Sequence, residues 1–218
     1  MTSSLLPFSP HQLRLLSRSC YGDPLLPRYL ERTLSEGPGD YAWSPAPGTY
    51  LGEQVPLWER VFTQIWHQGT LYPATYVALP VWCEVVIKSP DRNHAPLLER
   101  IGLIEQSRGR QEKELALVVG QDMVRAYEAA LQRLLPVLPE QIKRQEDATP
   151  GGLSTIRNLL GLQAFALGKR WAGMLLSRQV EPWIDLESGE PSVALIDAAM
   201  MLERDDLPEA IRAGRRKQ

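Results

Sequence analysis

Proline most constrains how this chain can fold, because it recurs where helices would begin. The chain has 18 prolines in 218 residues. Proline has a fixed φ and no peptide N–H, so it fits the first turn of a helix and disrupts the interior. Ser9-Pro10, Asp23-Pro24 and Thr149-Pro150 each place a capping side chain before such a proline. Strand patterns are nearly absent, so we predict an all-α protein of short helices joined by Pro/Gly turns.

Two stretches are expected to supply most of the core. Between Glu53 and His67, apolar residues occur in adjacent pairs once per turn, which gives a wide buried helix face. Residues 76–87 are apolar nearly all round, which favours a buried helix kinked at Pro80, with a strand over 81–87 as the alternative. The aromatic residues assigned to the core are Trp58, Trp66 and Trp82.

The second half of the chain predicts further helices. Pro96 begins a short helix that should end at Ser107-Arg108-Gly109, and a longer helix should run from about 112 to 135. Residues 153–167 and 171–177 are expected to form a helical hairpin that turns at Gly168.

These elements predict one helical domain over residues 1–211. A proline- and glycine-rich loop over 37–52 interrupts it. The basic tail 212–218 has nothing apolar to bury and is expected to be disordered.

Composition narrows the classes of protein that the chain can belong to. Lys and Arg total 24 against 26 Asp and Glu, so the net charge of -2 provides no broad basic field for nucleic acid. No run of 18 apolar residues is present to span a membrane, and the first residues lack the pattern of a signal peptide. Cys20 and Cys83 lie in apolar surroundings, so we expect two buried, reduced thiols in a cytoplasmic protein.

A resemblance is carried by residues 57–80, LWERVFTQIWHQGTLYPATYVALP. This run resembles the opening repeat of a group of uncharacterised bacterial HEAT-like proteins, in which a Trp-containing helix ends in His-Gln-Gly-Thr and is followed by Tyr-x-Ala. The resemblance implies a short, irregular α-solenoid of stacked antiparallel helix pairs. It brings no activity with it.

The sequence offers few residues for catalysis. There is no Gly-x-Ser-x-Gly elbow and no glycine-rich phosphate loop, and neither His11 nor His94 has a second His, Cys or carboxylate at i±3 or i±4 in a ligand-like arrangement. No metal, cofactor or catalytic residue is therefore predicted. His94 is assigned to a polar loop, and His67 to the last turn of its helix.

We predict a partner-binding surface in place of an active site. Exposed loop aromatics are common interface anchors, and the polar side of the 53–67 helix is the other candidate surface. The residues assigned to partner binding are Trp43, Tyr50, Glu59, Thr63, His67 and Gln68.

The resulting functional prediction is a non-enzymatic protein that binds another protein. The specific form is a bacterial immunity protein, or antitoxin, that neutralises a cognate toxin by stoichiometric binding, without contact with nucleic acid or membrane. Two alternatives stay open: a small hydrolase or transferase that uses His67 with nearby carboxylates, and a non-catalytic scaffold or adaptor.

Overall fold

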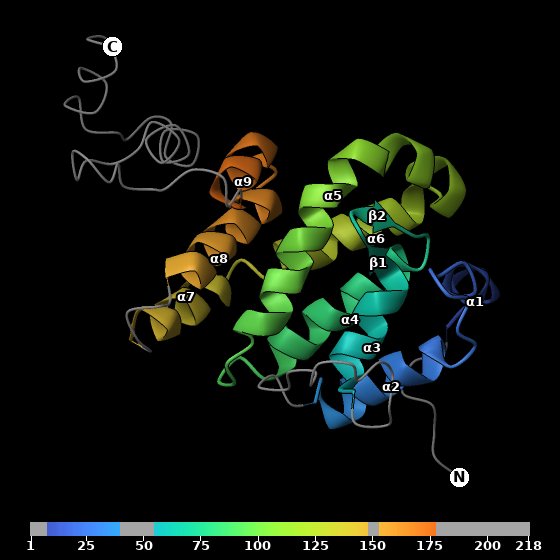
Figure 1. Cartoon of the computed structure of the whole chain (residues 1–218), viewed down its shortest axis with the longest axis horizontal. Coiled ribbons are helices and arrows are strands. Elements are labelled where there is room, and N and C mark those ends of the chain that lie inside the picture. The colour runs from blue at the N-terminus through green and yellow to red at the C-terminus, as the bar shows by residue number, and fades with distance from the viewer. Residues whose placement is uncertain (1–7, 40–54, 148–152, 178–218) are drawn as a thin grey trace.

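The computed structural model describes residues 8–39, 55–147 and 153–177 (Figure 1). The protein is mostly helical, as predicted. The elements in chain order are α1 (Pro10–Leu16), α2 (Leu26–Glu36), α3 (Leu57–Ile65), β1 (Trp66–His67), β2 (Thr70–Leu71), α4 (Thr75–Lys88), α5 (Ala95–Val119), α6 (Gln121–Gln132), α7 (Leu138–Asp147), α8 (Leu153–Ala166) and α9 (Arg170–Ser177). Most of the 37–52 loop and the whole basic tail 212–218 lie outside the described residues.

The long helix α5 lies between two groups of helices (Figure 1). The helices α7, α8 and α9 gather on one side of it, where α8 packs against both α5 and α9. On the other side, α4 packs against α2 and α6, and α2 against α3. The core therefore runs from α3 and α4 across to α5 and α6.

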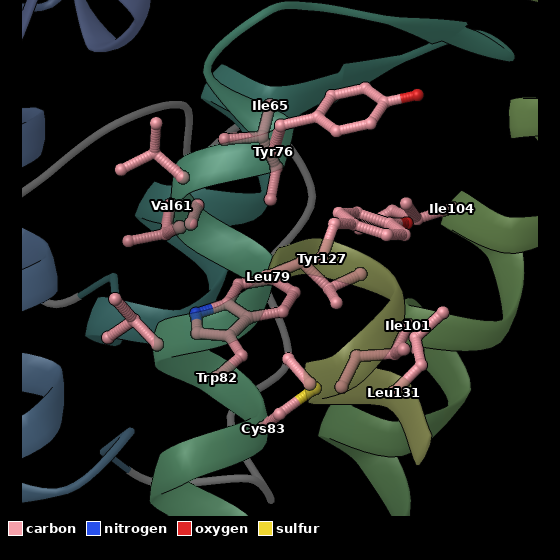
Figure 2. Packing of buried hydrophobic residues seen from close by; sticks show 14 of the residues in the cluster. Val61, Ile65, Tyr76, Leu79, Trp82, Cys83, Ile101, Ile104, Tyr127 and Leu131 are labelled. Atoms are coloured by element: carbon pink, nitrogen blue, oxygen red, sulfur yellow. The ribbon is translucent and has the colours of Figure 1, made fainter. Parts of the chain in front are cut away.

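The central helix α4 confirms the predicted helix over 76–87 and rules out the strand alternative. It contains Pro80 in its interior, and ten of its 14 residues are buried. Figure 2 shows its side chains meeting those of α5 and α6, with Trp82 and Cys83 beside Ile101 and Leu131. Trp82 has no exposed surface at all, and the buried residues occur on every side of the helix, so α4 lacks a polar face.

The core assignments are confirmed for Trp58 and Trp82, which are buried, and corrected for Trp66, which is half-buried. The indole of Trp66 stacks on Phe62 and its Nε1 donates to Ser107 Oγ at 2.9 Å. Neither cysteine is in a disulfide. Cys83 is buried as expected, and burial raises the pKa of its thiol, whereas Cys20 is only half-buried because it lies in the turn after α1.

The predicted hairpin of α8 and α9 is confirmed. Gly168 has φ 73°, its N–H donates to Phe165, and the N–H of Lys169 donates to Ala164, which together form a Schellman turn. The two helices also approach closely at glycine, because a Cβ at Gly173 would lie 2.6 Å from the Phe165 ring.

The predicted break at Ser107-Arg108-Gly109 is wrong, since α5 continues through it as one helix of 25 residues. The break comes at Gly120, between α5 and α6. Gly120 has φ 84° and ψ 153°, a conformation that is essentially restricted to glycine. The backbone at this one residue therefore decides where the two helices separate.

Gly120→Ala should lower the free energy of unfolding by about 1–3 kcal/mol, because a side chain is strained in this conformation. Nothing lies within 4 Å of the position that a Cβ would take, so the cost comes from the backbone and not from a clash. Urea unfolding of the variant and the unaltered chain measures this loss of stability. Gly102→Ala is the control. Gly102 lies inside α5 with a negative φ, and an added Cβ would make an ordinary contact, 3.8 Å from the carbonyl oxygen of Asn158, so this change should affect stability much less. Equal stabilities for the two variants would contradict this account.

The turn before α5 is held by a buried histidine, which corrects its assignment to a polar loop. His94 is fully buried, and its Nε2 lies 2.9 Å from the carbonyl oxygen of Ser89. Its peptide N–H donates to Oε1 of the buried Gln141 at 2.8 Å. Nε2 of Gln141 donates in turn to the carbonyl oxygens of Pro90 and Arg92. Burial lowers the pKa of His94, so the ring is held neutral as part of this network.

Candidate functional site

The segment after α3 is a tight β-hairpin, which corrects the assignment of His67 to a helical turn. The helix ends at Ile65, and β1 then pairs antiparallel with β2. Gln68 and Gly69 form the turn with φ 48° and 82°, the two positive values that a two-residue type I′ turn requires. The left-handed conformation of Gly69 thus belongs to this hairpin and not to a helix end.

The turn after α1 is attached to α3 and to the hairpin by one buried amide side chain. Gln64 Oε1 accepts from Ser19 Oγ at 3.1 Å and from the peptide N–H of Tyr21 at 3.3 Å. The backbone carbonyl oxygen of Gln64 accepts from the peptide N–H of Cys20 at 2.7 Å. These bonds place Tyr21 beside His67. The two rings meet edge to face with centroids 6.0 Å apart, and Tyr21 Oη lies 3.4 Å from Nδ1 of His67.

The last turns of α5 hold the other side of the hairpin and the start of α1. Gln111 donates from Nε2 to the carbonyl oxygen of Gly69 at 2.8 Å and accepts at Oε1 from Leu71 N at 3.1 Å. His11 Nε2 lies 3.0 Å from the carbonyl oxygen of Val119. Helix α1, the hairpin and the α5–α6 corner thus form one end of the molecule, at the right in Figure 1.

This end carries exposed apolar and aromatic side chains. Leu13 is 46% exposed, Tyr21 61% and Leu117 88%. We call this surface the end face, and its residues are Leu13, Tyr21, His67, Gln68, Leu117 and Val118. Isolated exposed leucines are normal on a protein surface, but a group of large apolar side chains at one end is typical of a surface that meets a partner.

The six predicted partner-binding residues are not brought together as one surface. Trp43 and Tyr50 lie outside the described residues. His67 and Gln68 belong to the end face, whereas the helical face expected to join Glu59, Thr63 and His67 is interrupted where α3 ends.

Glu59 and Thr63 have other neighbours. Glu59 Oε2 lies 3.9 Å from Nη2 of Arg100 on α5, and Thr63 Oγ1 donates within α3 to the carbonyl oxygen of Arg60. Partial burial raises the pKa of Glu59, and the positive charge of Arg100 opposes that rise. Both side chains are half-buried, so they offer less surface to a partner than the end face does.

A buried ionic cluster was missed by the sequence analysis. Glu105 and Arg108 of α5 are both buried, with Arg108 Nε 3.2 Å from Glu105 Oε2. Tyr127 of α6 donates its hydroxyl to Glu105 Oε1. Nη1 of Arg108 also lies 3.4 Å from Oε1 of Glu112 and 3.3 Å from Oε1 of Glu128, which are nearer the surface. The signal was present, because 105 and 108 continue the apolar stripe of Ile101 and Ile104 with one acid and one base.

Burial dominates the titration of this cluster. It raises the pKa of Glu105, against the opposing effect of Arg108, and raises the pKa of Tyr76 to about 12. Tyr127, whose ring lies 4.8 Å from that of Tyr76, has a pKa raised well above its usual value by burial and by Glu105. Both tyrosines are therefore neutral at physiological pH, and the charges of the cluster are those of Arg108 and the carboxyl groups of Glu105, Glu112 and Glu128 around it.

The chemistry open to His67 follows from its surroundings. Within residues 8–39, 55–147 and 153–177, Tyr21 is the side chain recorded in ring or hydrogen-bond contact with it. No carboxylate is recorded in contact with the ring in this part of the chain. Tyr21 and His67 thus form an aromatic pair at this surface. The described residues also contain no group of three side chains that suits a metal ion.

No comparison with a known protein suggests a function, so the functional proposal depends on the geometry described above. None of the helices in the described segments combines the length and the apolar character needed to cross a bilayer. The chain matches no protein-family model, no curated protein and no solved structure.

Proposed function

We propose that this protein works by stoichiometric binding of another protein through the end face, without turnover of a small molecule. The observation that supports this is the concentration of exposed apolar side chains at one end of the fold: Leu13, Tyr21, Leu117 and Val118. Burying such side chains is the main favourable contribution to most protein–protein association. Tyrosine is also among the residue types enriched where binding energy is concentrated.

The end face is built on rigid supports, which also suits binding. Tyr21 follows a turn fixed by the buried Gln64, and the hairpin is held on α5 by Gln111. Side chains held in place before binding lose less conformational entropy on association. A stable complex therefore requires little rearrangement of these segments.

The specific form that we propose is an immunity protein that covers a cognate toxin. A helical scaffold of stacked HEAT-like pairs is part of this proposal, with α8 and α9 as the clearest antiparallel pair. Such scaffolds commonly present a partner-binding surface and need no catalytic group. A scaffold or adaptor role uses the same surface, and the identity of the bound protein distinguishes the two.

The test is to purify the tagged full-length chain with its partner from its native cell and to measure the mass of the complex. We expect an equimolar complex that Leu13→Asp and Leu117→Asp each weaken at least about tenfold, because each places a charge in an apolar interface. Leu167→Asp is the matched control, since Leu167 lies in the α8–α9 turn and is 47% exposed, close to the 46% of Leu13. Equal weakening by all three variants would contradict binding at the end face.

Toxin neutralisation is tested by adding this protein to the purified partner at defined molar ratios and measuring the remaining toxin activity. Protection should require at least one copy of this protein for each toxin molecule. Protection at strongly substoichiometric amounts, or a His67→Ala variant that binds normally but no longer protects, would favour the hydrolase or transferase alternative.

A further inference from the structure

The part of the end face formed by α1 and the hairpin carries positive charge. Arg14 and Arg18 are exposed, and residues 8–22 and 66–72 contain no Asp or Glu. Nearby, Asp23 is engaged with the peptide N–H of Leu25 at 2.8 Å. At the α5–α6 corner the charges are mixed, because Glu114 lies next to Lys113, Glu112 pairs with Arg108 and Asp122 pairs with Arg125. The surface formed by α1 and the hairpin is therefore positive, although the whole chain has a net charge of -2.

The two arginines are also available to a partner. Among the described residues, the recorded ion pairs include neither Arg14 nor Arg18. They are four residues apart, and the bond from Arg18 N to Leu15 O continues the helical turn past the end of α1. Their side chains therefore project from the same side, one turn apart. Leu13 and Tyr21 lie at either end of this pair in the sequence.

We propose that the end face recognises an acidic segment of the partner protein, with two carboxylates about one helical turn apart beside an apolar side chain. This inference rests on the proposed function and names the chemistry of the partner. Each carboxylate accepts paired hydrogen bonds from a guanidinium, a geometry that arginine provides and lysine does not. The apolar side chain packs on Leu13 and Tyr21.

An acidic protein segment fits this surface better than nucleic acid does. Tight binding to nucleic acid typically engages about 6–10 phosphates through Lys and Arg. Here two arginines stand near an exposed tyrosine, and both residue types are enriched where the binding energy of protein interfaces is concentrated. Two charges steer a partner and fix its orientation, while the apolar contacts supply affinity.

The test uses fluorescence anisotropy with the full-length chain and four synthetic helical peptides. The first has Glu at two positions four residues apart with Leu between them, and the others replace both Glu by Gln, both Glu by Lys, or the Leu by Ala. We expect the Glu/Leu peptide to bind at least about tenfold more tightly than each of the other three. Raising NaCl from about 0.05 M to about 0.5 M should weaken it, because salt screens exposed charges.

The variants then locate the binding. R14E/R18E should lose the Glu/Leu peptide and bind the Lys/Leu peptide more tightly than the Glu/Leu peptide. Tyr21→Ala should weaken the Glu/Leu peptide about thirtyfold. K88E/K143E makes the same change in net charge at exposed positions on α4 and α7, and should bind like the unaltered chain.

Three results would overturn the inference: no binding of the Glu/Leu peptide up to about 1 mM, binding that R14E/R18E leaves unchanged, or tighter binding of a poly-dT oligonucleotide or of vesicles with one quarter anionic lipid. None of these bears on whether the native complex forms. If that complex forms and depends on Leu13 while the peptides fail, only the acidic chemistry is wrong. If no complex forms, the proposed function itself fails.

Discussion

Trp82→Ala should lower the free energy of unfolding by about 3–5 kcal/mol, one of the largest effects of any single substitution in this chain. The Trp82 side chain has no exposed surface and lies within the main hydrophobic core. Its ring is stacked near Phe62 of α3, with centroids 6.4 Å apart. Removing it leaves a cavity in the core, and well-packed helices close such cavities only in part.

Urea unfolding followed by circular dichroism measures this effect. Trp82→Phe is the matched control, because Nε1 of Trp82 has no hydrogen-bond partner among the described residues, so this change loses volume without losing a bond recorded there. Trp66→Ala should cost less than Trp82→Ala, since Trp66 is half-buried. An equal loss for Trp82→Ala and Trp66→Ala would show that α4 is not the centre of the core.

Arg108→Met should be comparably destabilising, by about 3–5 kcal/mol, because it leaves a buried carboxylate without its cation. Glu105 has no exposed surface, and Arg108 is the ion-pair partner recorded for it. Methionine keeps much of the length and volume of the arginine stem. The loss is therefore expected from charge and not from packing.

The pH dependence separates these two causes. Burial raises the pKa of Glu105, and losing Arg108 removes a group that lowers it, so the value rises further in the variant. A group whose pKa is higher in the folded than in the unfolded chain favours folding at low pH, and that contribution is lost as the pH rises through the folded pKa. The deficit of Arg108→Met relative to the unaltered chain should thus be largest near about pH 8 and shrink towards about pH 4.3, the usual value for Glu.

One double variant completes this test. Glu105→Gln combined with Arg108→Met removes both charges and should be more stable than Arg108→Met alone at neutral pH. A deficit that does not change with pH would assign the effect of Arg108 to packing.

Helices with a strong apolar pattern could be predicted from sequence, and junctions set by the backbone could not. The buried helix at 76–87 and the α8–α9 hairpin were predicted, because nearly continuous apolar character and Gly168 are visible in the sequence. The hairpin after α3 was missed because Gln68 adopts a positive φ, which glutamine rarely does. Similarly, Gly109 is tolerated inside α5 while Gly120 ends it, and the sequence alone gives both glycines the same weight.

The candidate site was predictable only in part, for a related reason. His67 and Gln68 do reach the end face, but through the hairpin and not through a helical turn. Tyr21 was missed because its position depends on the buried Gln64, 43 residues away. The ionic cluster was missed because a Glu and an Arg on an apolar stripe look like a solvated helix edge until the partner Tyr127 is placed. Such pairings are long-range contacts, which local periodicity does not encode.

The bonds of Gln141 bear on the order in which the chain matures as it leaves the ribosome. The peptide N–H of His94, just before the first turn of α5, donates to Oε1 of Gln141, which is 47 positions later in the chain. While α5 and α6 emerge, this end of the longest described helix has to bond to water. Only when α7 has been synthesised and docks does the amide of Gln141 replace that water and exclude solvent from the turn. The longest described helix is thus synthesised early, and the hydrogen bond before its first turn forms late in translation.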